Sequence, residues 1–548
     1  MLDITLKRPA VAKRAGKADA PLVSRRTQTL IIASIISLAA LLDLWWLGKP
    51  SIWMDEAISI DLARQPLHTL AAAFTSGVAP NMGLYFLLLH GWIALGSFLH
   101  IAPSEVFIRL PSAVFAILAS VVVYLLGERF FGRFAAIVAA LAFTANGWQL
   151  TYAQDARSYS LQLLLVSLTW LGLFAALRPD RLDWRWWSVF VVAGALSVYA
   201  QSISGLALVA LGVTCGLLMV LPTTWRERVR RAFPAIAAGF VAIGVLIAPF
   251  AYVSRHAGAS MAWVPAPTLS HLAQHAATVA LKYRHALGLA LVVALVLALL
   301  VALAVGALLS PWGRRQRAWL LRQDGGALKS DAAPLAIAVS CWLVVPVVAS
   351  YLISLGPSHI FTSRYLIVVL PALSLLVGAG VARLPWRALR LGLCVGGALA
   401  LLALLPAYYA NAQVEDWRAP TQWLAQHYQP GDGLVAYNNL EGCQLPVAYY
   451  LWADGSAAHF TPDSPGALHV DPTTYGNPEA DYLAALDPAA LSVYVSHHPR
   501  IFFIEGRLSD NADVARVKTA QAWLDAHYHF LGQTSSGIVT IRLYGATS

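Results

Sequence analysis

The sequence predicts a polytopic α-helical membrane protein with a small α/β domain at its C-terminal end, and three observations support this fold class. Of the 548 residues, 58% are hydrophobic and only 12% are charged, about half of the roughly 25% found in soluble proteins. Apolar runs long enough to cross a bilayer recur as far as residue 409. Beyond residue 409 the composition becomes that of a soluble domain. The mean hydropathy of +0.62 excludes a soluble enzyme, a disordered chain and a free nucleic-acid binder.

About eleven apolar runs are the expected transmembrane helices. The first, residues 28–48, follows a basic segment and leads into WWLGKPSIW, without the small-residue cleavage site of a secretory signal. We therefore expect a retained anchor, with residues 1–27 as a basic cytoplasmic N-terminus. The other runs lie near residues 108–127, 134–151, 159–177, 186–200, 203–221, 233–252, 287–309, 334–354, 365–382 and 388–409.

The orientation follows from the basic residues, because cytoplasmic loops of membrane proteins are enriched in Lys and Arg. The N-terminal segment and five alternate loops together carry 24 basic and 8 acidic residues, whereas the tail 410–548 carries 6 basic and 14 acidic ones. The net charge of +10 therefore reflects orientation in a bilayer and predicts no nucleic-acid partner. We expect the tail on the non-cytoplasmic side.

One further apolar stretch, MGLYFLLLHGWIALGSFL at 82–99, would invert every later loop if it crossed the membrane. We expect it to be a helix on the outer membrane face, with His90 and Trp92 at the interface. It belongs to an outer loop of residues 49–107, and a second outer loop covers residues 253–286. The whole transmembrane domain is expected to span residues 28–409.

Residues 410–548 alternate helical and strand-like patterns, which predict a small extracytoplasmic α/β domain. Helices are expected at 416–428 and 517–530, and strands at 433–438, 500–506 and 537–545.

Ionisable groups near a membrane are expensive, so those of the outer loops are candidates for chemistry. Asp55 and Glu56 follow directly after SIWM, at the outer end of the first span. A carboxylate there can act as a general base towards a hydroxyl or supply oxygen ligands to a divalent cation. The alternative is an ordinary loop acid or an acid at a helix N-terminus.

Several cations on the same side are candidate ligands of an anionic group, because a guanidinium can grip a phosphate with two hydrogen bonds. These cations are Arg109, Arg157, Lys282 and Arg364. The neighbours expected to support them are Tyr152, Gln154, Asp155 and Tyr365. The alternatives are a helix-capping Asp–Arg pair for Arg157 and, for the others, side chains that reach up to the lipid headgroups.

The sequence lacks the motifs of several other classes of protein. The sequence has no GxxxxGK[ST] phosphate loop, no GxSxG nucleophile motif and no metal-ligand spacing of Cys or His. The four cysteines are too scattered for a disulfide framework. No cofactor is indicated beyond a divalent cation at Asp55 and Glu56, the one metal position the sequence offers.

An ordered series of motifs resembles the membrane glycosyltransferases of the GT-C type. The motifs are WMDEAIS, NMGLYFLLLHGW, RLPSAVFAILASVVVYLLGERFFGR, YAQDARSYSLQLLL and SRYLIVVLPALSLLVG. They are most similar to the branch that contains the protein O-mannosyltransferases, the lipid A aminoarabinose transferase and the RgtA-like enzymes. The resemblance covers about residues 28–385 and implies the GT-C fold.

The resemblance also implies a sugar donor carried on a polyprenyl phosphate, and transfer with inversion at the outer face of a bacterial inner membrane. Asp55 matches the first acid of the family's Asp-Glu motif and would be the catalytic base, with Glu56 in a supporting or cation-binding role. Arg109, Arg157 and Arg364 match family arginines that would bind the donor phosphate. The Pro-Pro that many relatives have before the outer helix is replaced by PNMG at residues 80–83.

A transporter or a flippase for lipid-linked sugars is the alternative from another class. Transporters place ionisable groups within their spans near the midplane, whereas these spans are nearly free of charge. The sequence therefore favours a hexosyl- or pentosyltransferase whose hydroxyl acceptor is a lipid, a glycan or a protein. A protein that keeps the fold without the activity is a third alternative, which the intact Asp55 disfavours.

Overall fold

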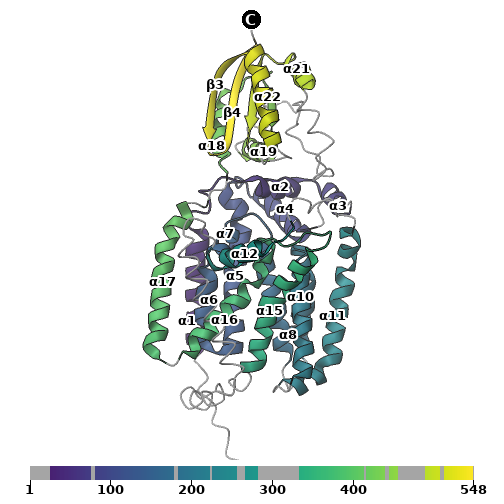
Figure 1. The fold of residues 1–548 in the computed structure, drawn as a ribbon, viewed down its shortest axis with the longest axis vertical. Helices are drawn as coiled ribbons and strands as arrows, with labels where there is room; N and C mark the ends of the chain where they lie inside the picture. Colours follow the sequence, from purple (N-terminus) through teal and green to yellow (C-terminus); the bar gives the residue numbers. More distant parts are fainter. Residues whose placement is uncertain are drawn as a thin grey trace, which may run out of the picture.

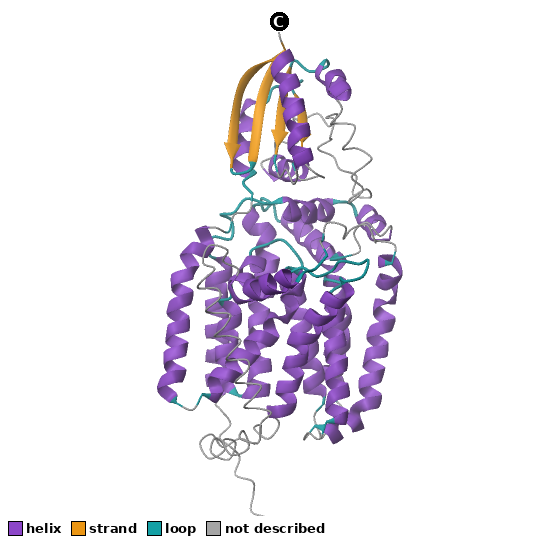
Figure 2. Cartoon of the chain, in the orientation of Figure 1, coloured by secondary structure: helices purple, strands orange, loops and turns teal. Residues whose placement is uncertain are grey.

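A helical bundle and a small four-stranded sheet are stacked end to end in the computed structural model (Figure 1). The structure describes residues 25–75, 81–177, 183–221, 225–255, 264, 266–281, 332–384, 386–410, 412, 415–437, 443–453, 488–506 and 511–546. Figure 2 shows the strands gathered at one end of the molecule and helices throughout the rest.

The bundle consists of long apolar helices that run roughly parallel to one another (Figure 1). Its helices are α1 (Arg25–Leu44), α5 (Glu105–Phe131), α6 (Arg133–Thr144), α7 (Gly147–Ala153), α8 (Tyr159–Ala176), α9 (Trp184–Ala200), α10 (Ser204–Val220), α11 (Arg226–Ser254), α15 (Ala332–Ile353), α16 (Leu370–Arg383) and α17 (Arg387–Ala410). A 3₁₀ helix, η4 (Tyr365–Val369), leads into α16.

Seven helices in the described part of the chain are long and apolar enough to cross a membrane, or eight if α6 and α7, which meet at 61°, form one broken span. Both α9 and α10 have 17 residues, about 25 Å at 1.5 Å per residue, which is short for a hydrocarbon core of about 30 Å. The run at 287–309 lies outside the described residues. A polytopic helical protein is therefore confirmed, and the number of eleven spans stays a prediction.

Close helix packing in the bundle depends on small residues and stacked aromatic rings. A Cβ on Gly378 of α16 would collide with the Ala135 carbonyl of α6, so glycine is what lets these two backbones approach. Trp170 of α8 and Trp342 of α15 stack with ring centroids 4.6 Å apart. The Trp342 indole N–H donates to the Val368 carbonyl at 3.0 Å, which satisfies a polar group in an otherwise apolar core.

Shorter helices lie at the end of the bundle that faces the sheet. These are α2 (Met54–Arg64), α3 (Leu67–Thr75), α4 (Gly83–Phe98) and, deeper in the bundle, α12 (Leu269–Leu281). The stretch expected as an outer-face helix is α4, which packs against α2, α5 and α9. His90 bonds to the Ala63 carbonyl and Trp92 donates to the Phe107 carbonyl, each at 2.8 Å, so both side chains anchor α4 to its neighbours.

The C-terminal region has a mixed sheet in the order β1-β2-β4-β3. Strands β1 (Gly433–Tyr437) and β2 (Arg500–Glu505) are parallel, whereas β4 (Val539–Ala546) is antiparallel to both β2 and β3 (Tyr528–Ser536). The helices of this region are α18 (Arg418–His427), α19 (Gln444–Ala453), α21 (Pro488–Val495) and α22 (Asn511–His527).

Alternate side chains of β2 enter two different cores, as the two-residue period of a strand requires. Ile501 and Phe503 pack with α21 and α22. Phe502 and Ile504 join a cluster that also contains Ile52 and residues of α2. That cluster is continuous and includes residues of α19, which packs against α2, so it links the sheet to the helix that carries the Asp-Glu pair.

The expected helix at 517–530 is wrong at its end, since residues 528–530 begin β3. The aromatic residues Tyr528 and Phe530 suit a strand, and β3 pairs with β4 through a two-residue turn. Gly537 in that turn has φ +61°, the left-handed conformation that such hairpin turns require. The helices α19 and α21 were missed by the sequence analysis.

Candidate active site

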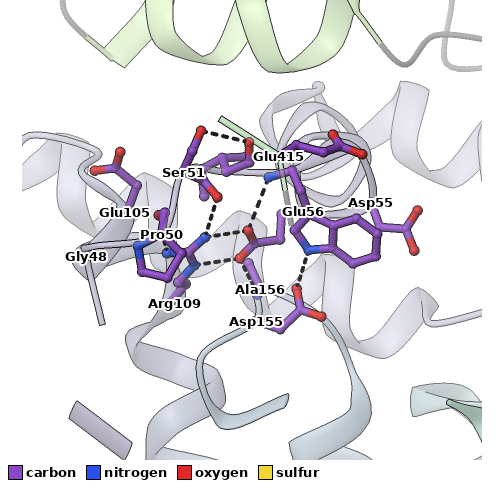
Figure 3. A network of polar contacts seen from close by, with 12 residues as sticks. Gly48, Pro50, Ser51, Asp55, Glu56, Glu105, Arg109, Asp155, Ala156 and Glu415 are labelled. Atoms are coloured by element: carbon purple, nitrogen blue, oxygen red, sulfur yellow. Dashed lines mark hydrogen bonds and ion pairs between the residues drawn. The ribbon is translucent and has the colours of Figure 1, made fainter. Parts of the chain in front are cut away.

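The Asp-Glu pair lies in the first turn of α2, directly after the extended segment Ser51–Trp53. Asp55 and Glu56 are the acidic residues of that turn, where carboxylates interact favourably with the helix dipole. The Glu56 carboxylate also accepts a long 3.4 Å hydrogen bond from the Trp53 backbone N–H, a contact of the kind seen in a capping box. Although adjacent, the two carboxylates point in different directions (Figure 3).

Glu56 is fully buried and paired with Arg109 of α5 (Figure 3). The guanidinium binds both carboxylate oxygens, with Nε at 2.7 Å from Oε1 and Nη2 at 2.6 Å from Oε2. Oε1 also accepts from the Ala156 backbone N–H at 2.8 Å. Glu56 therefore joins α2, α5 and the 154–158 loop at one point.

Arg109 uses its remaining N–H groups on the chain that leads into α2. It donates to the backbone carbonyls of Leu47 at 2.9 Å, Pro50 at 2.8 Å and Ser51 at 3.1 Å. Together with the two bonds to Glu56 this makes five, the number of N–H groups that a guanidinium has. Arg109 is 1% exposed, so the structure places it in the support of the site and leaves it no donor for a phosphate.

Asp55 faces the other two predicted arginines. Its Oδ2 lies 2.8 Å from Nη1 of Arg364 and 3.6 Å from Nη2 of Arg157. Arg364 precedes η4 and comes from a segment more than 300 residues away, and its side chain keeps 26% exposure. The structure thus brings together three of the residues that the sequence singled out, with one carboxylate between two cations.

Arg157 is held more firmly than Arg364. Its Nη1 donates to the Asp55 backbone carbonyl at 3.0 Å and to Ser59 Oγ at 3.3 Å. Its Nε is buried and has no hydrogen-bond partner in the described part of the chain. A buried guanidinium N–H without an acceptor is expensive, and an anionic oxygen would satisfy it.

Asp155 lies on the loop between α7 and α8, beside the Glu56 cluster. Its Oδ1 accepts from the Trp53 indole N–H at 3.2 Å (Figure 3). Burial, and next the nearby Glu56 carboxylate, raise the pKa of Asp155 to about 8.

The remaining predicted residues that the structure describes make contacts that hold the segments around the site together. Gln154 donates to the Trp45 carbonyl at 2.8 Å and the Asp43 carbonyl at 3.1 Å, which ties the loop to the end of α1. Tyr152 packs against Tyr159 with centroids 4.2 Å apart, and the Arg364 guanidinium lies 5.5 Å from the Tyr365 ring centroid. Lys282 lies outside the described residues.

A divalent cation does not fit between Asp55 and Glu56. Each carboxylate is already paired with arginine, and Figure 3 shows the two carboxylates pointing away from each other. Hard cations bind several oxygen ligands that converge. Among the described residues no group of three or more His, Cys, Asp or Glu side chains could hold a metal ion. The candidate metal position of the sequence analysis is therefore not supported by the geometry.

The C-terminal region contributes contacts that the sequence analysis missed. The Tyr450 hydroxyl of α19 accepts from the Ile52 N–H at 2.8 Å and donates to Glu105 at 3.0 Å. The buried Glu415 carboxylate accepts from the Met54 N–H at 3.3 Å. The helix expected at 416–428 was the only sequence signal near these positions, and nothing marked Tyr450.

Comparisons with known proteins agree with this architecture. A model of the dolichyl-phosphate-mannose-protein mannosyltransferase family matches residues 88–253. The structure is similar to that of ArnT from Cupriavidus metallidurans in the apo state, with 14% identity, a TM-score of 0.52, and coverage of 94% of this chain and 98% of ArnT. The ArnT structure bound to undecaprenyl phosphate gives 14% identity, a TM-score of 0.51, and coverage of 95% and 98%. A comparison with curated proteins finds no significant match.

The chain is therefore a membrane protein with the GT-C fold of the membrane glycosyltransferases. The family match adds a likeness to the protein mannosyltransferases in particular, over helices α4 to α11. The resemblance that the five motifs carried is confirmed, and a transporter or flippase is not favoured.

Proposed function

We propose that this protein is an inverting glycosyltransferase that moves a sugar from a polyprenyl-phosphate donor to a hydroxyl acceptor. The observation that carries the proposal is the Asp55 carboxylate between Arg364 at 2.8 Å and Arg157 at 3.6 Å. The GT-C fold and the ArnT structure bound to undecaprenyl phosphate support the class of donor. A base beside two cations is what displacement of a phosphate by a hydroxyl needs.

In the proposed reaction Asp55 accepts the proton of the acceptor hydroxyl. The hydroxyl oxygen then attacks the anomeric carbon from the side opposite the phosphate, and a new C–O bond forms. The bond from the anomeric carbon to the phosphate oxygen breaks, and the polyprenyl phosphate leaves with the electron pair. The configuration at the anomeric carbon is inverted, and the proton stays on Asp55 until water takes it.

The two arginines beside Asp55 are the proposed phosphate ligands. Arg364 is the more accessible one, and its contact with Asp55 can be exchanged for a phosphate oxygen as the donor binds. Arg157 offers the buried Nε that has no acceptor among the described residues. Positive charge placed in advance where negative charge develops stabilises the transition state.

Arg109 and Glu56 have a positioning role in this proposal. All five N–H groups of Arg109 are engaged within the protein, and the resulting cluster fixes the segment that ends at Asp55. This revises the expectation that Arg109 binds phosphate and that Glu56 takes part in the chemistry. Lys282 stays a candidate phosphate ligand from the sequence alone.

We further propose that the reaction takes place on the periplasmic face of a bacterial inner membrane, with the C-terminal region on that side. The basic residues of the alternate loops support this orientation. The acceptor is a lipid, a glycan or a protein, and the sugar is a hexose or a pentose.

The test is a donor panel. The purified full-length protein in lipid nanodiscs is incubated with undecaprenyl-phosphate sugars and with membrane extract as the acceptor source, and products are analysed by mass spectrometry. We expect release of undecaprenyl phosphate and one product that gains the mass of the sugar. No turnover of any undecaprenyl-phosphate sugar would contradict the proposal, and so would ATP-driven movement of an unmodified lipid-linked sugar.

A further inference from the structure

A pocket lies next to the proposed phosphate ligands, where three connecting segments meet. It is bounded by Asn81 before α4, by the turn from α9 to α10, and by the segment that ends at Tyr365. The cavity measures about 170 Å³. The ring of Tyr365, which lines the pocket, lies 5.5 Å from the Arg364 guanidinium, the cation that contacts Asp55.

Most of the accessible lining of the pocket is apolar, and its smaller polar part can form hydrogen bonds with a hydroxylated ligand. Its polar side chains are Asn81, Gln201, Ser202 and Tyr365, and three aliphatic side chains complete it. Gln201 is 1% exposed, and its Oε1 has no hydrogen-bond partner among the described residues. Leaving a buried amide oxygen unpaired is unfavourable, so a ligand hydroxyl that reaches Gln201 Oε1 would gain a favourable hydrogen bond.

The described lining contains no Asp, Glu, Lys, Arg or His. The first turn of α10 also offers little to an anion, although helix N-termini often bind anions. The backbone N–H groups of Ser204, Gly205 and Leu206 donate to carbonyls of residues 201–203 at 2.9–3.0 Å. The Ser202 N–H donates to Asn81 Oδ1 at 2.9 Å. The pocket therefore suits an uncharged ligand with hydroxyl groups and apolar C–H faces.

We propose that this pocket holds the sugar ring of the donor, and that this ring carries no amino or carboxylate substituent. The inference rests on the proposed function, because the sugar is bonded directly to the phosphate that Arg364 is proposed to bind.

The test measures donor binding to the full-length protein in nanodiscs by competition with fluorescent undecaprenyl phosphate. The probes are undecaprenyl phosphate without sugar, with a neutral hexose or pentose, with an amino sugar, and with a uronic acid. We expect the best neutral sugar to bind at least about tenfold more tightly than the sugar-free lipid, which corresponds to about 1.4 kcal/mol. The amino sugar and the uronic acid should gain no such advantage.

The variant Gln201→Leu should remove most of that tenfold advantage and leave the affinity for the sugar-free lipid unchanged. Gln162→Leu is the matched control, because Gln162 is as buried, also has an unpartnered Oε1, and does not line the pocket. Ser202→Ala, a milder change, should lower the affinity for the neutral donor several-fold.

Two results would overturn the pocket assignment alone, provided that donors still bind and turn over. The first is tightest binding of a donor with a charged sugar. The second is an equal loss of affinity for the neutral donor in Gln201→Leu and Gln162→Leu. Failure of the wild-type protein to bind any undecaprenyl-phosphate probe would overturn the proposed function together with the pocket.

Discussion

At the scale of single residues, the two neighbouring acids have opposite surroundings. Glu56 is enclosed by Arg109, all of whose N–H groups are hydrogen-bonded within the protein, and by backbone N–H groups. Asp55, in contrast, faces two arginines that belong to different segments. Of the two neighbouring acids, Glu56 therefore stabilises the structure of the site, and Asp55 is the one that is proposed to react.

Glu56→Gln tests the holding role. Removal of one charge leaves the buried Arg109 cation uncompensated, so we expect a loss of about 3–5 kcal/mol of stability. Thermal unfolding of the detergent-purified variant is the measurement. Glu128→Gln is the control, since Glu128 also pairs with an arginine but keeps 24% side-chain exposure, and it should lose much less. Equal melting temperatures for Glu56→Gln and wild type would contradict a structural role.

Asp155 gives a prediction of pH dependence. An unfolded aspartic acid has a pKa near 4, whereas burial raises the pKa of Asp155 in the folded protein to about 8. The folded state therefore binds more protons in that window, and stability contributed by Asp155 falls as the pH rises through it. Asp155→Asn mimics the protonated acid, so its melting temperature relative to wild type should rise between pH 5 and pH 8.5. A difference that is independent of pH would be inconsistent with the raised pKa.

At the scale of secondary-structure elements, the C-terminal region is part of the site's framework. α19 packs against α2, and Tyr450 fixes the backbone of Ile52, three residues before Asp55. Its neighbour Tyr449 bonds instead to the Pro103 carbonyl at 2.8 Å. The two tyrosines are therefore natural controls for each other.

Tyr450→Phe should lower kcat about tenfold with a small change in the KM for donor. The variant leaves the buried Ile52 N–H without an acceptor and loosens the segment that aims Asp55. Tyr449→Phe should reduce thermal stability to a similar degree and keep kcat near the wild-type value. The measurement is steady-state kinetics of both variants with the donor that the donor panel identifies. Equal kcat values in the two variants would argue against positioning of Asp55 by Tyr450.

The elements also show what the sequence can predict. The long apolar runs predicted the bundle helices because length and hydropathy suffice for them. The motifs predicted that Asp55, Arg157 and Arg364 would lie on the same side of the membrane, as a candidate base and candidate phosphate ligands. The role of Arg109 depends on carbonyls exposed by a turn at residues 47–51, and Tyr450 reaches Ile52 across 398 residues. Neither contact leaves a periodic or local pattern.

At the scale of the whole molecule, orientation in the membrane links the charge pattern to the site. In a background without the native cysteines, Arg226→Cys on α11 and Gln533→Cys on β3 place thiols at exposed positions of the two ends. An impermeant maleimide added to intact cells with a permeable outer membrane should label the Gln533→Cys protein only. The Arg226→Cys protein should react after the inner membrane is permeabilised, and the reverse order would invert the proposed topology.

The most direct test of the central claim is single-turnover sugar transfer by Asp55→Asn in nanodiscs. The account predicts a rate about 100- to 10,000-fold below wild type, the usual contribution of a general base, in a protein that is still folded and still binds donor. Asp61→Asn, the same substitution six residues further along α2, should transfer at the wild-type rate. An Asp55→Asn rate within threefold of wild type would contradict Asp55 as the base.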